Sequence, residues 1–141
     1  MFGFLMSIIA GAVMSIQGVF NTRLSEKTGL FESSVIVQGT AFIASLIIML
    51  IGGKGNIKEA LSVDKLYLTG GILGTVITVT VMLAMGKLSP TMAVSVILIS
   101  QLLTAGIIDG FGLFGTEKIA FGFKKILGLI SIIGGIILFK I

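Results

Sequence analysis

Uncharged, strongly apolar stretches alternate with short polar segments along this chain. A helix rises about 1.5 Å per residue, so it crosses the roughly 30 Å hydrocarbon core of a bilayer with about 20 apolar residues. Four of the stretches have that length, and a shorter fifth follows near the end. The pattern therefore predicts five membrane-spanning helices, at about 2–22, 32–53, 66–86, 90–111 and 121–140.

The fifth predicted helix differs from the others because its uncharged part, 126–139, is short. Lys124, Lys125 and Lys140 bracket it. Lysine side chains can extend towards the headgroups while their carbon stems stay in the hydrocarbon. The segment is expected to span if these lysines snorkel outwards in this way.

The high hydrophobic content and low charged content of the chain indicate which solvent surrounds it. Hydrophobic residues make up 55% and charged residues 11% of the 141 residues, against about 25% charged in soluble domains. A soluble domain of this size keeps much of its surface exposed, so it cannot hide five apolar segments. We expect an all-α integral membrane protein with a single membrane domain over 1–141. The lipid bilayer is its solvent.

Residue types that are missing restrict the chemistry. The chain has no cysteine and no histidine, which argues against disulfides, thiolate nucleophiles, haem ligation and most zinc sites. The sequence shows no catalytic triad, metal-ligand cluster or paired carboxylates. Its net charge of +4 comes from scattered basic residues and not from a stripe suited to nucleic acid. We expect no catalytic residues, no metal, no cofactor and no nucleic-acid partner, and we do not expect an enzyme.

Basic residues between the segments bear on orientation. With five spans, the loops on the N-terminal side hold six Lys residues, and those on the other side hold four Lys or Arg residues. The positive-inside rule then places the N-terminus in the cytoplasm, with a small bias. So small a bias also permits the chain to insert both ways up.

The first segment carries the clearest polar pattern. At 100° per residue, one face gathers small and polar side chains, and the other gathers large apolar ones. The small face holds Ser7, Ala10, Gly11, Met14, Gln17, Gly18 and Asn21. Small residues let helices pack closely, and amides can hydrogen-bond across such an interface. Alternatively, the face lines a polar cavity in which Gln17 and Asn21 contact a solute or water.

The fourth segment places Gln101, Ala105 and Asp109 on one stripe, with Thr104 beside Gln101. An acid inside a membrane segment is a functional-site hypothesis by default. Asp109 lies near the end of its segment, however, so a water-exposed carboxylate at the interface is the alternative. Gln38 in the second segment is a further cavity candidate. Threonines of the third segment are better explained by hydroxyl bonds to their own helix.

Several short runs follow one another along the chain in a distinctive order. The runs are Gln17-Gly18-Val19-Phe20-Asn21-Thr22-Arg23-Leu24, Ser89-Pro90-Thr91, Gln101-Leu102-Leu103, the run from Asp109 to Gly115, and the run from Leu127 to Leu138. In their order and spacing these runs resemble the YdcZ-like family, a five-span branch of the drug/metabolite transporter superfamily. The resemblance covers nearly the whole chain.

The resemblance implies that five spans are half of a ten-helix inverted-repeat transporter, with the substrate site between the halves. A second copy inserted in the opposite orientation, or a paralogous half, would complete it. Related small multidrug exporters carry a glutamate in their first helix. This chain has Met14, Ser15 and Gln17 there instead, which leaves Asp109 as the substitute for proton coupling.

These observations together predict a multi-pass protein of a bacterial inner (plasma) membrane that exports a small organic solute by alternating access in an antiparallel dimer. The predicted substrate cavity comprises Ser7, Gly11, Gln17, Asn21, Gln38, Gln101, Thr104 and Asp109. A passive pore for small neutral solutes and a non-transporting subunit of a membrane complex are the alternative hypotheses.

Overall fold

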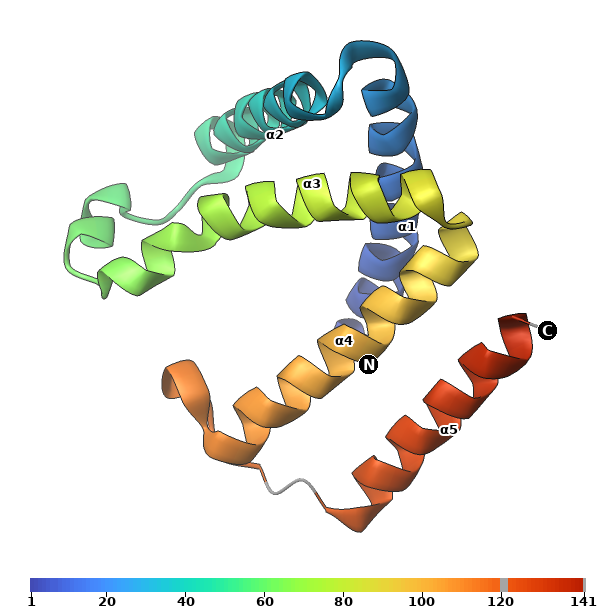
Figure 1. The fold of residues 1–141 in the computed structure, drawn as a ribbon. Helices are drawn as coiled ribbons and strands as arrows, with labels where there is room; N and C mark the ends of the chain where they lie inside the picture. The colour runs from blue at the N-terminus through green and yellow to red at the C-terminus, as the bar shows by residue number, and fades with distance from the viewer. Residues whose placement is uncertain (120–121, 141) are drawn as a thin grey trace. The chain divides into compact units, whose positions relative to one another are not determined.

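The structure, a computed structural model, describes residues 1–119 and 122–140, without the side chains of Phe139 and Lys140. Its described residues form helices and connecting turns (Figure 1). Five are α-helices: α1 (Phe2–Thr28), α2 (Leu30–Gly52), α3 (Gly70–Lys87), α4 (Pro90–Phe111) and α5 (Phe123–Lys140). The expected all-α class is therefore confirmed. The chain divides into two compact units, Met1–Lys87 and Leu88–Ile141.

The first helix is longer than its apolar stretch predicts. The sequence placed its end near residue 22, but α1 continues to Thr28. Arg23 and Glu26 form an ion pair of 3.1 Å within this extension, and both are good helix formers. Charged residues mark where the hydrocarbon is expected to end, whereas the helix itself continues beyond that point.

A single residue, Gly29, separates α1 from α2. Its φ of 99° lies in the left-handed region that glycine adopts without steric cost. Its N–H donates to the Ser25 carbonyl at 3.0 Å, and its own carbonyl accepts from the N–H of Ser33 at 3.1 Å. The turn is thus short and hydrogen-bonded on both sides, and α2 begins two residues earlier than expected.

The polar connection 54–65, between the second and third predicted helices, contains the 3₁₀ helix Ile57–Leu61 and leads into a second, Lys65–Thr69. The side chains of Asn56 and Asp64 cap them, accepting N–H bonds of 3.1 and 2.9 Å. Short polar side chains commonly cap helices in this way. Lys65–Lys87 as a whole corresponds to the third predicted span.

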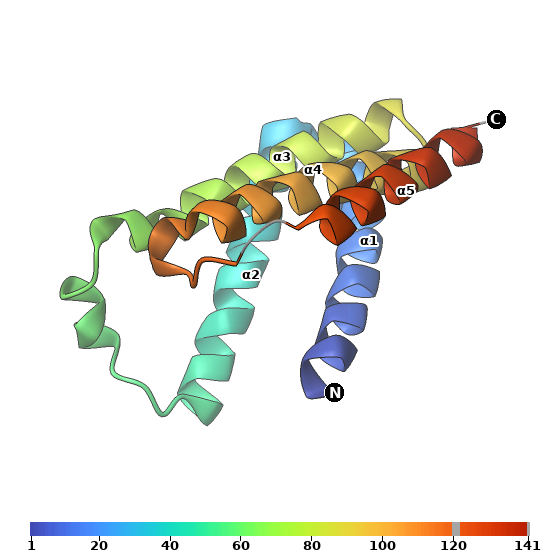
Figure 2. The same cartoon turned by 90° about the horizontal axis from the view of Figure 1, so that it is seen from below.

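In the first unit, α3 packs across both α1 and α2 (Figures 1 and 2). α3 approaches α1 closely at Gly18. A Cβ placed there would lie 2.6 Å from Cε of Met85 and 3.3 Å from Cγ1 of Val81. A side chain at residue 18 would therefore require the end of the Met85 side chain to move. Met82 and Met85 are buried on the α3 side.

In the second unit, α4 and α5 lie side by side and run in opposite directions (Figures 1 and 2). Pro90 occupies the first turn of α4, as expected, and the Ser89 hydroxyl caps it by accepting from the N–H of Met92 at 3.3 Å. Gly112 ends α4 in the left-handed region with φ 65°. Residue 121, at which the fifth helix was expected to begin, lies outside the described residues.

Apolar side chains cover the outside of both units. Among the described hydrophobic residues, only Met82, Met85 and Ala93 are buried. In the part of the chain that the structure describes, four stretches are long and apolar enough to cross a bilayer: Phe2–Thr28, Leu30–Gly52, Lys65–Lys87 and Pro90–Phe111. Because α5 is not among these four, its crossing stays a prediction based on snorkelling lysines, and the Lys140 side chain lies outside the described part.

Candidate functional site

The small, polar face of α1 divides into a packed part and an open part. Gly18, Asn21 and Thr22 are buried, and Asn21 is only 9% exposed. The Thr22 hydroxyl donates to the Gly18 carbonyl at 2.8 Å, so it is satisfied within its own helix. Helix packing therefore accounts for the end of this face that lies against α3.

The rest of this α1 face is exposed in the chain. The Ser7 hydroxyl donates to the Gly3 carbonyl at 2.9 Å, and a Cβ at Gly11 would meet nothing within 4 Å. Gln17 is exposed and makes no side-chain hydrogen bond within the described residues. An amide at this depth in a spanning helix needs a polar partner, because hydrocarbon offers none.

Gln38 has a partner inside the first unit. Its Nε2 donates to Oγ1 of Thr75 on α3 at 3.2 Å, and a Cβ at Gly74 would lie 3.5 Å from that nitrogen. The Thr75 hydroxyl in turn donates to the Gly71 carbonyl at 3.1 Å. Gln38 thus joins α2 to α3, whereas the sequence suggested only that it faces a cavity.

The threonines of α3 behave as expected from the sequence. Thr78 and Thr80 donate to the carbonyls four residues earlier, Gly74 and Val76, at 2.9 and 2.8 Å. Beside them is a pocket of about 370 Å³ between α2 and α3. Its lining is mainly apolar and consists of Phe31, Ser34, Val35, Thr75, Val76, Val79 and Thr80.

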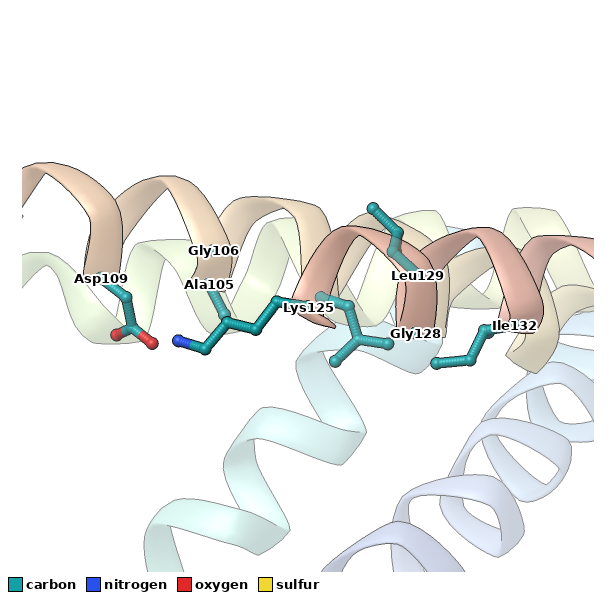
Figure 3. A pocket seen from close by; sticks show the side chains of 8 residues that line it. Ala105, Gly106, Asp109, Lys125, Gly128, Leu129 and Ile132 are labelled. Atoms are coloured by element: carbon teal, nitrogen blue, oxygen red, sulfur yellow. The ribbon is translucent and has the colours of Figure 1, made fainter. Parts of the chain in front are cut away.

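A groove of about 290 Å³ runs between α4 and α5 in the second unit. Its lining is Leu102, Ala105, Gly106, Asp109, Lys125, Gly128, Leu129 and Ile132. In Figure 3 the carboxylate of Asp109 and the amine of Lys125 point towards one another. An acid and a base therefore lie at one place in an otherwise apolar groove.

Two other residues predicted for the cavity lie on α4 outside this groove lining. Gln101 and Thr104 are both exposed, and neither side chain makes a hydrogen bond within the described part of the chain. Gln101 lies in the middle of α4, so it resembles Gln17 in being an unpaired amide at mid-span. It stays a prediction that these residues line one cavity.

Sequence reasoning missed Lys125 as a groove residue, since it treated this lysine only as a flanking charge. It also missed the burial of Ser33 and Ser34 at the start of α2. The Ser33 hydroxyl is 2.8 Å from that of Thr28 and donates to the Gly29 carbonyl. The sequence did contain a signal for this buried polar contact, namely a run of several polar residues at a predicted turn.

Comparison with known proteins gives one family. The family model described as "Putative inner membrane exporter, YdcZ" matches residues 2–138. No curated protein and no solved structure matches the chain. The match covers all five α-helices almost to their last residue.

Proposed function

Since the chain belongs to the YdcZ family of membrane exporters, we propose that it exports a small organic solute as one half of an alternating-access transporter. A second copy inserted in the opposite orientation supplies the other half. The membrane in question is the inner (plasma) membrane of a bacterium. The solute cavity forms where this second copy covers polar side chains of the chain.

The observation that carries the proposal is a pair of unpaired amides at mid-span. Gln17 on α1 and Gln101 on α4 are both exposed and lack hydrogen-bond partners among the described residues. Leaving a polar group unsatisfied in hydrocarbon costs several kcal/mol. These side chains must therefore face water, a solute or another protein chain, and an exporter cavity provides the first two.

Open glycine faces give further support for a second chain. A Cβ at Gly110, Gly134 or Gly135 would meet nothing within 4 Å. Small residues on membrane helices commonly mark close helix packing. Among the described residues no atom lies within 4 Å of a Cβ at these positions on α4 and α5, so they have room for a partner.

Replacing either amide by leucine tests the cavity. Gln17→Leu and Gln101→Leu should each reduce solute export from reconstituted vesicles by about tenfold or more, because each removes a polar contact from the translocation route. Ile16→Leu is the matched control, since this neighbour is 53% exposed and apolar. Assembly is checked by size-exclusion chromatography.

The same vesicles distinguish an exporter from a passive pore. An exporter coupled to a proton or sodium gradient accumulates solute against its own gradient, whereas a pore only equilibrates it. Undiminished accumulation in well-assembled Gln17→Leu and Gln101→Leu proteins would remove these amides from the site. Equilibration without accumulation under every imposed ion gradient would replace the exporter by the pore.

A further inference from the structure

The pocket between α2 and α3 is lined by one buried hydroxyl residue that has no partner. Ser34 lines this pocket and is only 5% exposed, and its hydroxyl makes no hydrogen bond within the described residues. Among the same residues, no fully buried side-chain oxygen lacks a partner. The Ser34 hydroxyl therefore reaches accessible surface, which at this residue is the wall of the pocket. It has a proton to donate, and hydrocarbon offers no acceptor.

The other two hydroxyl groups of the lining have already used their protons. Thr75 donates to the Gly71 carbonyl at 3.1 Å and accepts from Gln38. Thr80 donates to the carbonyls of Val76 and Ile77 at 2.8 and 3.1 Å. Among the described lining residues, Ser34 alone thus offers a hydroxyl proton to a bound molecule. A ligand of this pocket needs a single hydrogen-bond acceptor.

The rest of the lining determines the charge and polarity of what fits. Phe31, Val35, Val76 and Val79 supply apolar walls, and none of the described lining residues is ionisable. A charged solute would lose its hydration here and gain no counter-charge, which is unfavourable. The volume of about 370 Å³ lies in the lower part of the range for small-molecule sites. The pocket therefore suits a small, uncharged and mainly apolar molecule.

The pocket is too short to hold a lipid acyl chain. Its lining covers residues 31–35 of α2 and 75–80 of α3, which is about 8 Å of helix at roughly 1.5 Å per residue. An extended acyl chain spans one leaflet, about half of the roughly 30 Å hydrocarbon core. Much of such a chain would lie outside the pocket, whereas a compact molecule is enclosed by it.

We propose that this pocket binds a compact, uncharged apolar solute that carries one carbonyl group, and that the carbonyl accepts the hydrogen bond of Ser34. The apolar body of the solute lies against Val35, Val76 and Val79. Such a molecule dissolves in lipid, so it reaches the pocket from the bilayer. This inference assigns a binding site and a substrate class to the proposed exporter, and its role in transport rests on that function.

Binding is measured on the full chain in nanodiscs, with radiolabelled adamantanone as the probe. Adamantane has the same cage without the carbonyl, and protonated adamantylamine carries a charge in its place. Empty nanodiscs give the partition of each compound, so that every affinity refers to its concentration in the bilayer. Adamantanone should bind saturably, about fivefold more tightly than adamantane and at least about tenfold more tightly than the cation. Equal binding of all three, or saturable binding of none, overturns the proposal.

Removal of single hydroxyl groups assigns the hydrogen bond. Ser34→Ala should weaken adamantanone by about fivefold, to the affinity of adamantane, and leave adamantane itself unchanged. Thr80→Val is the matched control, since this hydroxyl residue lines the same pocket but donates within its own helix; it should leave both affinities unchanged. Equal loss of adamantanone in the two variants, or equal loss of both ligands in Ser34→Ala, contradicts the assigned bond.

A steric pair tests the pocket if Ser34→Ala fails to fold. Val76→Phe should reduce the binding of both adamantanone and adamantane by about tenfold or more, because the ring fills the pocket. Ile77→Phe is the control, since Ile77 is the next residue on α3, is similarly exposed (56% against 54%) and does not line the pocket. Equal effects of the two variants would contradict the placement of the site.

Lipid linkage distinguishes a solute from a phospholipid as the natural occupant. The ester carbonyls of ordinary phospholipids are acceptors that could reach Ser34, whereas ether-linked lipids lack them. Adamantanone should bind with similar affinity in nanodiscs of either lipid. Saturable binding in the ether-linked lipid alone would identify a lipid ester as the occupant and overturn the solute assignment.

These measurements separate the inference from the proposed function because binding needs no flux. A chain that binds adamantanone as expected but moves no solute in vesicles would contradict the exporter alone. A chain that exports another solute and shows no saturable binding of adamantanone would contradict the pocket assignment alone.

Discussion

At the scale of single residues, the contact between Gly18 and Met85 limits how closely α1 and α3 approach. The nearest atoms to a Cβ at Gly18 are the Cε and Sδ of Met85, at 2.6 and 2.8 Å. They belong to the far end of a flexible side chain, which can move at moderate cost. The effect of adding a methyl group is therefore measurable without being disruptive.

Gly18→Ala is expected to destabilise the first unit by about 1–3 kcal/mol through overpacking. Met85→Ala in the same chain should recover part of this loss by making room. Gly39→Ala is the control, because a Cβ at this α2 position meets nothing within 4 Å. Reversible unfolding in mixed micelles measures the free energies, and equal stability of the Gly18 and Gly39 variants would contradict the packing described.

The candidate site was predictable at this scale only in part. The sequence identified Gln17, Gln101 and Asp109 because an amide or acid among apolar residues is conspicuous. It could not identify Lys125, since a lysine beside an apolar stretch is also what a snorkelling anchor requires. Side-chain direction depends on which helix lies beside it, and a periodic pattern does not contain that information.

At the scale of helices, α2 and α3 are joined by a side-chain hydrogen bond between Gln38 and Thr75. Hydrogen bonds between membrane helices contribute about 0.6 kcal/mol on average and up to about 1.7 kcal/mol. The pocket of about 370 Å³ between these helices has a mainly apolar lining. This bond should therefore contribute measurably to their association.

A double-mutant cycle of Gln38→Leu and Thr75→Val should give a coupling free energy of about 0.5–1.5 kcal/mol. Thr78→Val provides the comparison, because Thr78 bonds to its own helix at 2.9 Å and should show no coupling to Gln38. Unfolding free energies of the single and double variants supply the cycle. A coupling free energy near zero would mean that the Gln38 amide does not face Thr75 in the membrane.

Helix bounds show how far apolar length predicts an element. The bounds expected for the fourth helix, 90–111, agree with α4 because Pro90 and Gly112 are both local signals for helix ends. The bounds of α1 differ from the expected ones, because charged residues end an apolar stretch without ending the helix. For α3, Gly70 and Gly71 follow a 3₁₀ segment, and hydropathy does not distinguish the two helix types.

At the scale of the whole molecule, the proposed partner is a copy with the opposite orientation. The chain has no cysteine, so a single introduced cysteine is a clean probe of topology. Gly55 lies in the connection after α2, and Lys27 lies at the end of α1, so one spanning helix separates them. A population inserted both ways presents each position on both sides of the membrane.

Gly55→Cys and Lys27→Cys should each be labelled in about half of the molecules by a membrane-impermeant maleimide on intact cells, since near-equal loop charges favour neither orientation. Labelling after permeabilisation gives the total for each variant and controls for reactivity. Full labelling at one position with none at the other would show a fixed orientation and point to a paralogous half as partner.

The one-residue turn at Gly29 has a consequence for how such a chain enters the bilayer. Because Gly29 alone separates them, we expect α1 and α2 to enter the bilayer together. Arg23, Glu26, Lys27 and Glu32 flank this bend, and their formal charges cancel. The bend therefore carries no net formal charge, so the membrane potential does no net work on its transfer from either leaflet.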